Sequence, residues 1–312
     1  MSEPLKILII RLSSIGDIVL TSPVVRCLKK QSNAEVHFLT NNQHTKLLHP
    51  NPYIDHVHSY PNDLEKLDKL PFDWLIDLHH NLRTFKLKRR WKVANKSFEK
   101  LNIEKFLLTK FKYNCLPNIH IVDRYLKTVE HLGIVNDNKG LDFFIPKETK
   151  LPSKFVFDQF VAIVIGGMHA TKVLPTNKLI ELCNSIPGNF VLIGGPDDTE
   201  RGNMIINKVG RGINSCGSLS IFQSALLVKN AEKVITHDTG MMHIAAAYQK
   251  NIISVWGNTV PDFGMYPYMA GSESKQVEVE NLSCRPCSKI GYDKCPKGHF
   301  KCMNLIEINQ IS

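Results

Sequence analysis

Apolar runs alternate with amphipathic stretches along the first half of the chain. Residues 5–10 (LKILII) form an apolar run, and apolar residues then recur at helical spacing over 18–30. Such a run followed by an amphipathic stretch is typical of a buried parallel strand that leads into a helix. The same pattern predicts two further strands and one helix, at 35–40, 73–78 and 123–132.

A second alternation begins after a stretch rich in Lys, Glu and Pro at 146–152. It predicts four more strands and two helices, at 160–165, 190–193, 233–236, 252–256, 176–183 and 241–248. Two successive alternations indicate two doubly wound α/β domains, which we place at 1–150 and 151–312. Ligands bind beyond the carboxyl ends of such strands, so we expect the active site in a cleft between the domains.

The composition is that of a globular protein, with 43% of the 312 residues hydrophobic and 22% charged. No stretch approaches the run of about twenty apolar residues that a membrane helix needs. No small-residue cleavage site follows the first apolar segment, so we expect a cytoplasmic protein. The net charge is +10, and residues 1–150 carry most of the excess, with 24 Lys and Arg against 16 Asp and Glu.

Much of that excess lies in one helix-prone segment, residues 83–112, which holds eleven basic residues and only two acidic ones, Glu99 and Glu104. A charge run of this kind is most often a solvated helical face. It also suits nucleic acid, an anionic membrane surface or a phosphorylated substrate. The aromatic residues in the segment are spaced like the core face of a helix rather than a platform for stacked bases.

The turn after the first predicted strand, residues 11–23 (RLSSIGDIVLTSP), has one glycine where a dinucleotide-binding turn has three. Its carboxylate, Asp17, would repel a phosphate at the start of the following helix. The turn therefore does not suit phosphate binding. Asp17 is either a helix N-terminal charge, worth about 0.3 to 1 kcal/mol, or a group with a chemical role.

Two segments of the second half lie where strands end and helices begin. In 237–243 (HDTGMMH), free backbone N–H groups suit phosphate oxygens, and Thr239 and Gly240 allow a close approach. The alternative is a helix cap with His243 packed in the core. Lys172 precedes a helix expected to start at Pro175, where its ammonium could face a diphosphate; the alternative is an exposed loop lysine.

Taken together, four segments resemble the bacterial heptosyltransferases of glycosyltransferase family 9: KILIIRLSSIGDIVLTSPV, TKVLP, GGPDDTE and DTGMMHIAAA, which begin at residues 6, 171, 194 and 238. The resemblance covers nearly the whole chain. It implies two Rossmann-like domains facing a central cleft, the GT-B arrangement, with the acceptor on the first domain and the donor on the second. It also implies inverting transfer of heptose from an ADP-sugar to the lipopolysaccharide core, without a catalytic metal.

The resemblance also implies roles for individual residues. Asp17 falls on the family's proposed general base, and Lys172 would counter the charge on the leaving diphosphate. Asp238 would hold sugar hydroxyls, and an acid after the second glycine pair, Asp198 or Glu200, would bind the ribose. The remaining donor residues would be Thr171, Leu219, Thr239, Gly240 and His243, and those for the acceptor Ser14, Gly16 and Arg83.

Four of the eight cysteines cluster in a tail at about 281–304, together with His299. Their spacing, Cys284-x2-Cys287-x7-Cys295-x6-Cys302, starts as a zinc motif does but lacks a second closely spaced pair. Structural zinc and four free thiols are therefore both open. The other four, which suit buried small hydrophobes, are Cys27, Cys115, Cys183 and Cys216.

The leading hypothesis is thus an ADP-sugar-dependent transferase that acts on an anionic glycolipid, in peripheral contact with the cytoplasmic face of the membrane. A second keeps the fold and mechanism but changes the nucleotide sugar or the glycan acceptor. A third, from a different class, is a non-catalytic nucleic-acid or membrane binder that uses residues 83–112. The first predicts no bound nucleic acid, and the third leaves Asp17, Lys172 and Asp238 unexplained.

Overall fold

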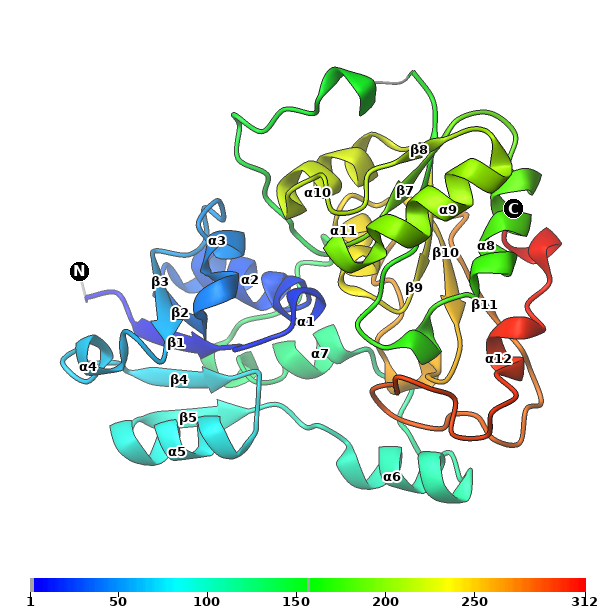
Figure 1. Ribbon diagram of the computed structural model, residues 1–312. Coiled ribbons are helices and arrows are strands. Elements are labelled where there is room, and N and C mark those ends of the chain that lie inside the picture. Colours follow the sequence, from blue (N-terminus) through cyan, green and yellow to red (C-terminus); the bar gives the residue numbers. More distant parts are fainter. Residues whose placement is uncertain (1–2, 156–157) are drawn as a thin grey trace. The chain divides into compact units, whose positions relative to one another are not determined.

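The computed structural model describes residues 3–155 and 158–312, which divide into two compact units (Figure 1). Unit 1 comprises Met1–Lys100 and Ile119–Phe144, and unit 2 comprises Leu101–Asn118 and Ile145–Ser312. The sequence predicts one boundary at residue 150. The structure differs in two respects: the chain passes from unit 1 to unit 2 for the last time at residue 145, and residues 101–118 also belong to unit 2.

Unit 1 is built on a parallel sheet of five strands in the order β3-β2-β1-β4-β5. The strands are β1 (Lys6–Ile10), β2 (Glu35–Asn41), β3 (His56–Tyr60), β4 (Trp74–Asp77) and β5 (Ala94–Ser97). In the central strand β1, Ile7 to Ile10 are fully buried. Neighbouring residues of a strand face opposite sides, so these side chains supply the core on both faces of the sheet.

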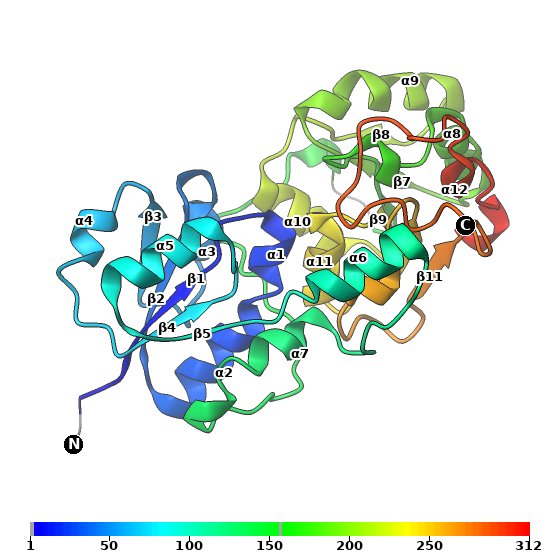
Figure 2. The ribbon, with the colours of Figure 1, turned by 90° about the horizontal axis from the view of Figure 1, so that it is seen from below.

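Helices cover both faces of this sheet (Figure 2). Helix α2 (Ser22–Ser32) packs against α7 (Ile121–Leu126) on one face, and α5 (Leu82–Trp91) lies on the other, where its Leu87 joins the core beside Leu8. The shorter helices of the unit are α1 (Ile15–Val19), α3 (Thr45–Leu48) and α4 (Leu64–Leu67).

Two helical predictions for the first 150 residues are wrong in detail. The predicted helix 18–30 is two helices, α1 and α2, because Pro23 has no N–H to donate and its ring would clash with the preceding turn of a continuous helix. The basic segment 83–112 is not one long helix. Lys92 ends α5 in a left-handed conformation, and β5 and a second helix, α6 (Asn102–Phe111), follow.

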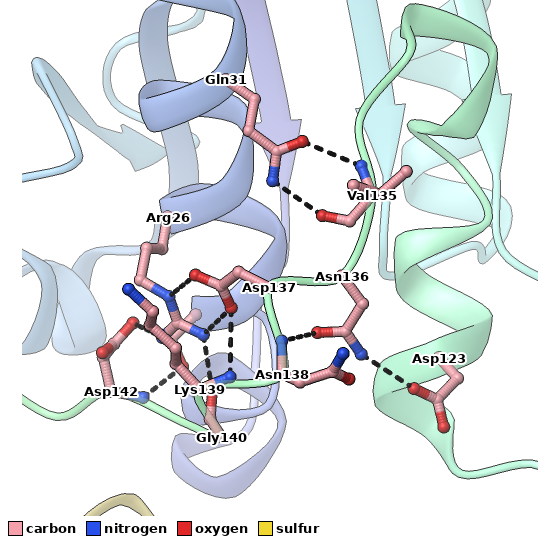
Figure 3. Close-up of polar contacts among 11 residues, drawn as sticks. Arg26, Gln31, Asp123, Val135, Asn136, Asp137, Asn138, Lys139, Gly140 and Asp142 are labelled. Atoms are coloured by element: carbon pink, nitrogen blue, oxygen red, sulfur yellow. Dashed lines mark hydrogen bonds and ion pairs between the residues drawn. The ribbon is translucent and has the colours of Figure 1, made fainter.

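A buried arginine ties the returning segment of unit 1 to α2 (Figure 3). Arg26 donates to both oxygens of Asp137, at 2.9 and 2.8 Å, and to the Gly140 carbonyl at 2.8 Å, and it also pairs with Asp142. Its side chain is only 3% exposed. This network, together with the paired contacts between Gln31 and the backbone of Val135, holds residues 135–142 on the helix.

Unit 2 contains a parallel sheet of six strands in the order β11-β10-β9-β6-β7-β8. The strands are β6 (Val161–Val164), β7 (Phe190–Ile193), β8 (Ile213–Asn214), β9 (Lys233–His237), β10 (Asn251–Trp256) and β11 (Lys275–Glu278). Helices α8 (Thr176–Ser185) and α9 (Thr199–Val209) pack together on one face of the sheet, and α10 (Ile221–Asn230) and α11 (Gly240–Ala247) on the other (Figure 2).

The C-terminal segment completes the core of unit 2. Met303, in the short helix α12 (Lys301–Asn304), and Ile311 are fully buried and belong to the same apolar cluster as the strands β6, β7 and β10. Cys302 joins this cluster at 4% exposed. The tail after residue 281 is therefore an integral part of unit 2.

Candidate active site

Asp17 lies just beyond the carboxyl end of β1, in the first turn of α1. Its Oδ1 is 2.6 Å from Nη2 of Arg11, and its Oδ2 accepts hydrogen bonds from the backbone N–H and the hydroxyl of Ser14, at 3.1 and 2.9 Å. Ser14 caps α1, so the sequence expectation of a helix N-terminal charge is partly correct. Gly16, which is buried, completes the turn.

The guanidinium of Arg11 is fixed by hydrogen bonds of its own. Its Nη1 donates to the Leu78 carbonyl at 2.5 Å and to the Tyr125 hydroxyl at 3.0 Å, and its Nε donates to the Ser13 carbonyl at 2.8 Å. Burial alone would raise the pKa of Asp17, but Arg11 and Ser14 outweigh it and lower that pKa. The carboxylate is therefore ionised at neutral pH, fixed in direction and partly open, with 19% of its side chain exposed.

His79 follows β4 just as Asp17 follows β1, and these strands are neighbours in register, with Ile10 opposite Asp77. Burial, and then the positive charge of Arg11, lower the pKa of His79 to about 4, so its ring is neutral. Its Nδ1 is buried with no hydrogen-bond partner in the described part of the chain. Sequence reasoning missed both Arg11 and His79, although the meeting of neighbouring strand ends could have pointed to His79.

Arg83 is placed differently from the other predicted acceptor residues. It is exposed in the first turn of α5, six residues beyond the end of β4, where its backbone N–H donates to the Asn81 side chain that caps the helix. The structure therefore brings Ser14, Gly16 and Asp17 together in one turn but does not place Arg83 within it.

In unit 2, two of the residues predicted to bind the nucleotide sugar, Lys172 and Asp238, form an ion pair with each other. Lys172 follows β6 and Asp238 follows β9, which are neighbouring strands. Lys172 Nζ lies 2.6 Å from Asp238 Oδ2, and the Thr259 hydroxyl donates to the same oxygen at 3.0 Å. Their side chains are 16% and 12% exposed, so the pair reaches the surface.

Helix α11 starts directly after this aspartate. Thr239 caps it without a side-chain hydrogen bond to the helix, and Gly240 is its first residue. His243 is buried one turn later, as the packed-histidine alternative expects. His237 accepts a hydrogen bond from the Leu174 N–H at 3.0 Å, and burial lowers its pKa to about 3, so it is a neutral structural group.

The two candidate ribose-binding acids have different surroundings. Asp198 Oδ2 accepts from the Gly195 N–H at 2.9 Å, and a Cβ placed on Gly194 would lie 2.8 Å from that oxygen. Only glycine fits there, so Asp198 stabilises its own loop. Glu200 is exposed. Half-buried Leu219 follows Gly217, whose N–H donates to the Gly194 carbonyl at 3.3 Å, so the two loops lie together.

Thr171 is only 2% exposed, and its hydroxyl is occupied by the C-terminal tail. The hydroxyl donates to the Tyr292 carbonyl at 2.9 Å and accepts from the Tyr292 N–H at 2.8 Å. The backbone of Thr171 pairs with the same carbonyl at 3.1 Å. This threonine anchors the tail beside Lys172. Because both bonds of its hydroxyl are made to Tyr292, the hydroxyl is not free to bind a nucleotide sugar.

The four clustered cysteines are free thiols. Cys284 Sγ lies 3.9 Å from His299 Nε2, and Cys287 Sγ donates to the Cys284 carbonyl at 3.0 Å. Burial raises the pKa of Cys287 to about 11 and that of Cys302 to about 12. In residues 3–155 and 158–312, no three ligand atoms of this cluster, which also includes Cys295, lie within 4.8 Å of one another. Structural zinc and free thiols therefore both stay predictions for this cluster.

A model of glycosyltransferase family 9 (heptosyltransferase) matches residues 65–295. This chain belongs to glycosyltransferase family 9. It is 24% identical to lipopolysaccharide heptosyltransferase 1 of Campylobacter coli over an alignment of 290 residues, which covers 82% of this chain and 84% of that protein. It is therefore a glycosyltransferase, and the prediction of a non-catalytic binder is wrong.

Solved structures share its fold. A family 9 glycosyltransferase from Veillonella parvula is 21% identical, with a TM-score of 0.75 and coverage of 100% of this chain and 96% of that one. The E. coli ADP-heptose LPS heptosyltransferase II is 17% identical, with a TM-score of 0.69 and coverage of 96% and 98%. The predicted GT-B class, two α/β domains with parallel sheets, is confirmed. Within the described residues, no helix is long and apolar enough to cross a bilayer.

Proposed function

We propose that this family 9 enzyme transfers a heptose, or a similar sugar, from an ADP-sugar to the core of lipopolysaccharide or a related surface glycolipid, with inversion at the anomeric carbon. The observation that carries the proposal is the ionised carboxylate of Asp17, held by Arg11 and Ser14 in the turn after β1. The relatives' names, which specify lipopolysaccharide and ADP-heptose, support the substrate class.

In the proposed reaction, Asp17 takes the proton of an acceptor hydroxyl while that oxygen attacks the anomeric carbon. The bond from this carbon to the diphosphate breaks, and ADP leaves with the electron pair. The neutral ring of His79 is a further group beside Asp17 that can contact the acceptor. Ser14 and Gly16 shape the turn, and Arg83 meets the acceptor from α5.

Lys172 would stabilise the negative charge that develops on the leaving diphosphate. An ammonium has three N–H donors, and Asp238 occupies one of them, so donors remain for phosphate oxygens. Asp238 would fix the direction of Lys172 and accept from a sugar hydroxyl. Thr239 and Gly240, at the start of α11, would bind the phosphates through backbone N–H groups, with His243 packed behind them. This charge arrangement requires no metal.

For the nucleoside, the structure favours Glu200 over Asp198 as the ribose ligand, because Asp198 is bonded to its own loop whereas Glu200 is exposed. Leu219, half-buried on the adjoining loop, would contact the base. Thr171 would act by holding the tail through the bonds of its hydroxyl to Tyr292, rather than by contacting the nucleotide sugar.

We also propose peripheral contact with the cytoplasmic face of the membrane through α6. This helix exposes Ile103, Phe106 and Phe111 at 73%, 52% and 68%, with Lys110 among them. Exposed aromatic and basic residues on one helix are typical of an interfacial segment on anionic lipid. Flotation with anionic vesicles tests it: the double variant Phe106→Ser and Phe111→Ser should lose binding, and Val135→Ser, exposed in unit 1, should not.

Titration of the purified chain with ADP, UDP and GDP by calorimetry, in the presence of EDTA, tests the donor. We expect ADP to bind at least tenfold more tightly than the other two, without a metal. Selective binding of UDP or GDP would favour the second hypothesis, another nucleotide sugar on the same fold. Loss of ADP binding in EDTA would contradict the metal-free mechanism.

A further inference from the structure

Three ligand-type side chains converge at the edge of the unit 1 sheet. Glu35 Oε1 lies 3.0 Å from His37 Nε2 and 3.3 Å from His56 Nε2. Glu35 and His37 are two residues apart on β2 and face the same side, and the parallel register sets His56 of β3 opposite His37. Within residues 3–155 and 158–312, this is the one group of three such ligand atoms that all lie within 4.8 Å of one another.

We propose that Glu35, His37 and His56 bind a divalent transition-metal ion, with Zn²⁺ as the best fit. Two imidazole nitrogens and one carboxylate oxygen form a ligand set that suits zinc. The site does not depend on the proposed transferase function.

The distances are close to those around a tetrahedral ion. Bonds of about 2.0 to 2.2 Å place the ligand atoms of tetrahedral zinc roughly 3.3 to 3.6 Å apart. Oε1 of Glu35 is already at 3.0 and 3.3 Å from the two ring nitrogens, so small side-chain rotations complete the geometry. The other carboxylate oxygen, Oε2, lies 3.6 Å from Lys6 Nζ, which leaves Oε1 as the single ligand atom of Glu35.

A second layer of residues orients His37. Its Nδ1 lies 2.9 Å from Nε2 of His58, a ring that is 2% exposed and parallel to it, and Phe72 packs edge-on against the His37 ring. When Nε2 of His37 binds a metal, its proton sits on Nδ1 and is donated to His58. A partner of this kind fixes the ring of a metal-binding histidine.

The exposed histidine supplies access. The His56 side chain is 53% exposed, so an ion can enter from solvent, and water can take the fourth coordination position. Glu35 and His56 are the first residues of their strands, whereas Asp17 follows the carboxyl end of β1. The metal would therefore join the edge strand β3 to β2, at the amino end of the sheet and away from Asp17.

Zinc titration of the metal-free protein by calorimetry tests the proposal. The clustered thiols could also bind zinc, so the experiment uses a background with Cys284→Ser and Cys287→Ser. In that background we expect one bound Zn²⁺ per chain and a higher Tm in its presence. His56→Ala should weaken binding at least tenfold and abolish the Tm shift, while His49→Ala, a neighbouring exposed histidine, should bind as the background does.

Glu35→Gln is the second variant, because it keeps the shape of the side chain and removes the charge. Weakened zinc binding by both Glu35→Gln and His56→Ala, with unchanged circular dichroism, would support the site. If His56→Ala and His49→Ala bind zinc equally well, or if the background protein binds none, the proposal is wrong.

Discussion

At the scale of single residues, Asp17 is a carboxylate that Arg11 and Ser14 keep ionised and fixed in orientation. The Asp17→Asn variant keeps an oxygen that can accept from Ser14 but cannot take a proton. We expect kcat to fall by about 10² to 10⁴, the usual effect of removing a general base, while ADP affinity stays near that of the wild type. Steady-state kinetics and calorimetry measure the two quantities.

The control for this variant is Asp158→Asn, which changes an exposed aspartate of unit 2 in the same way. Because Arg11 is buried and loses its charged partner in Asp17→Asn, the Tm of both variants should be recorded. Near-normal turnover by a folded Asp17→Asn protein would remove Asp17 from the mechanism.

The lowered pKa of Asp17 gives a pH prediction. A carboxylate with a depressed pKa stays ionised as the pH falls from 7 to about 4, its ordinary value, and is protonated only below that. In the pH range over which the protein stays folded, kcat/KM should therefore show no acid limb from Asp17 above about pH 4. An acid limb near pH 6 that disappears in Asp17→Asn would contradict this assignment.

Lys172 is predicted to serve both binding and chemistry. Replacing Lys172 by Ala should weaken ADP-sugar binding and lower kcat by about 10² to 10³, because the ammonium attracts the diphosphate in the ground state and more strongly as the bond breaks. Lys178→Ala, which removes a lysine of α8 paired with Glu181, is the matched control. A change confined to acceptor KM would assign Lys172 elsewhere.

At the scale of helices and strands, α2 depends on its buried arginine. Replacing Arg26 by Met leaves Asp137 and Asp142 without their partner, and losing one member of a buried ionic network costs about 3 to 5 kcal/mol. Urea denaturation should show that loss in the free energy of unfolding. Lys29→Met, on the same helix, removes a partly exposed pair with Asp55 and should cost no more than about 1 kcal/mol. Equal effects would mean that the network is not what holds residues 135–142.

Substitution of the basic residues of α5 tests whether they form a solvated face or a surface that binds the acceptor. Replacing Arg83, Lys86, Arg89 and Arg90 by Gln should raise the acceptor KM several-fold and leave the donor KM unchanged. In the wild type the acceptor KM should rise with salt, because exposed charges are screened beyond about 8 Å at 0.15 M. Arg90 already pairs with Asp68, so it should contribute least. Unchanged constants in the fourfold variant would leave α5 as a solvated face.

The sequence predicts the central strands well and the edge strands poorly. The predicted strands at 35–40, 190–193 and 252–256 correspond to β2, β7 and β10, because parallel strands buried on both faces read as apolar runs. The missed strands lie at the edges of the two sheets, where most residues are exposed or half-buried and no apolar run forms: β3, β5, β8 and β11.

In the candidate site, the sequence predicts the positions of residues at strand ends but not the contacts between their side chains. The strand-end positions of Asp17, Lys172 and Asp238 were predictable, because ligand-binding residues follow buried parallel strands. The contact of Arg11 with Asp17 was not, since it depends on how a long side chain is packed among Leu78 and Tyr125. Nor could the sequence show that Thr171 is bonded to Tyr292, 121 residues away.

At the scale of the whole molecule, the chain enters unit 2 at residue 101, returns to unit 1 at 119 and leaves it again at 145. Helix α6 is joined to the rest of unit 2 by contacts distant in sequence. Lys112 Nζ donates to the carbonyls of Cys284 and Pro286, at 3.2 and 2.7 Å, and Asn114 donates to Asp262 at 2.7 Å. These bonds explain why a boundary drawn from the linker alone is incomplete.

Because the two units alternate along the chain, some contacts within unit 2 can form only late in synthesis. Every residue of unit 1 has been made by residue 144, but Lys112 must wait for Pro286, 174 residues later. At about 5 to 20 residues per second, α6 spends roughly 10 to 35 s on the nascent chain without the partners that it has in the finished protein. During that interval the apolar side chains of α6 are available to chaperones, and the proposed contact of α6 with a bilayer can form before the synthesis of unit 2 is complete.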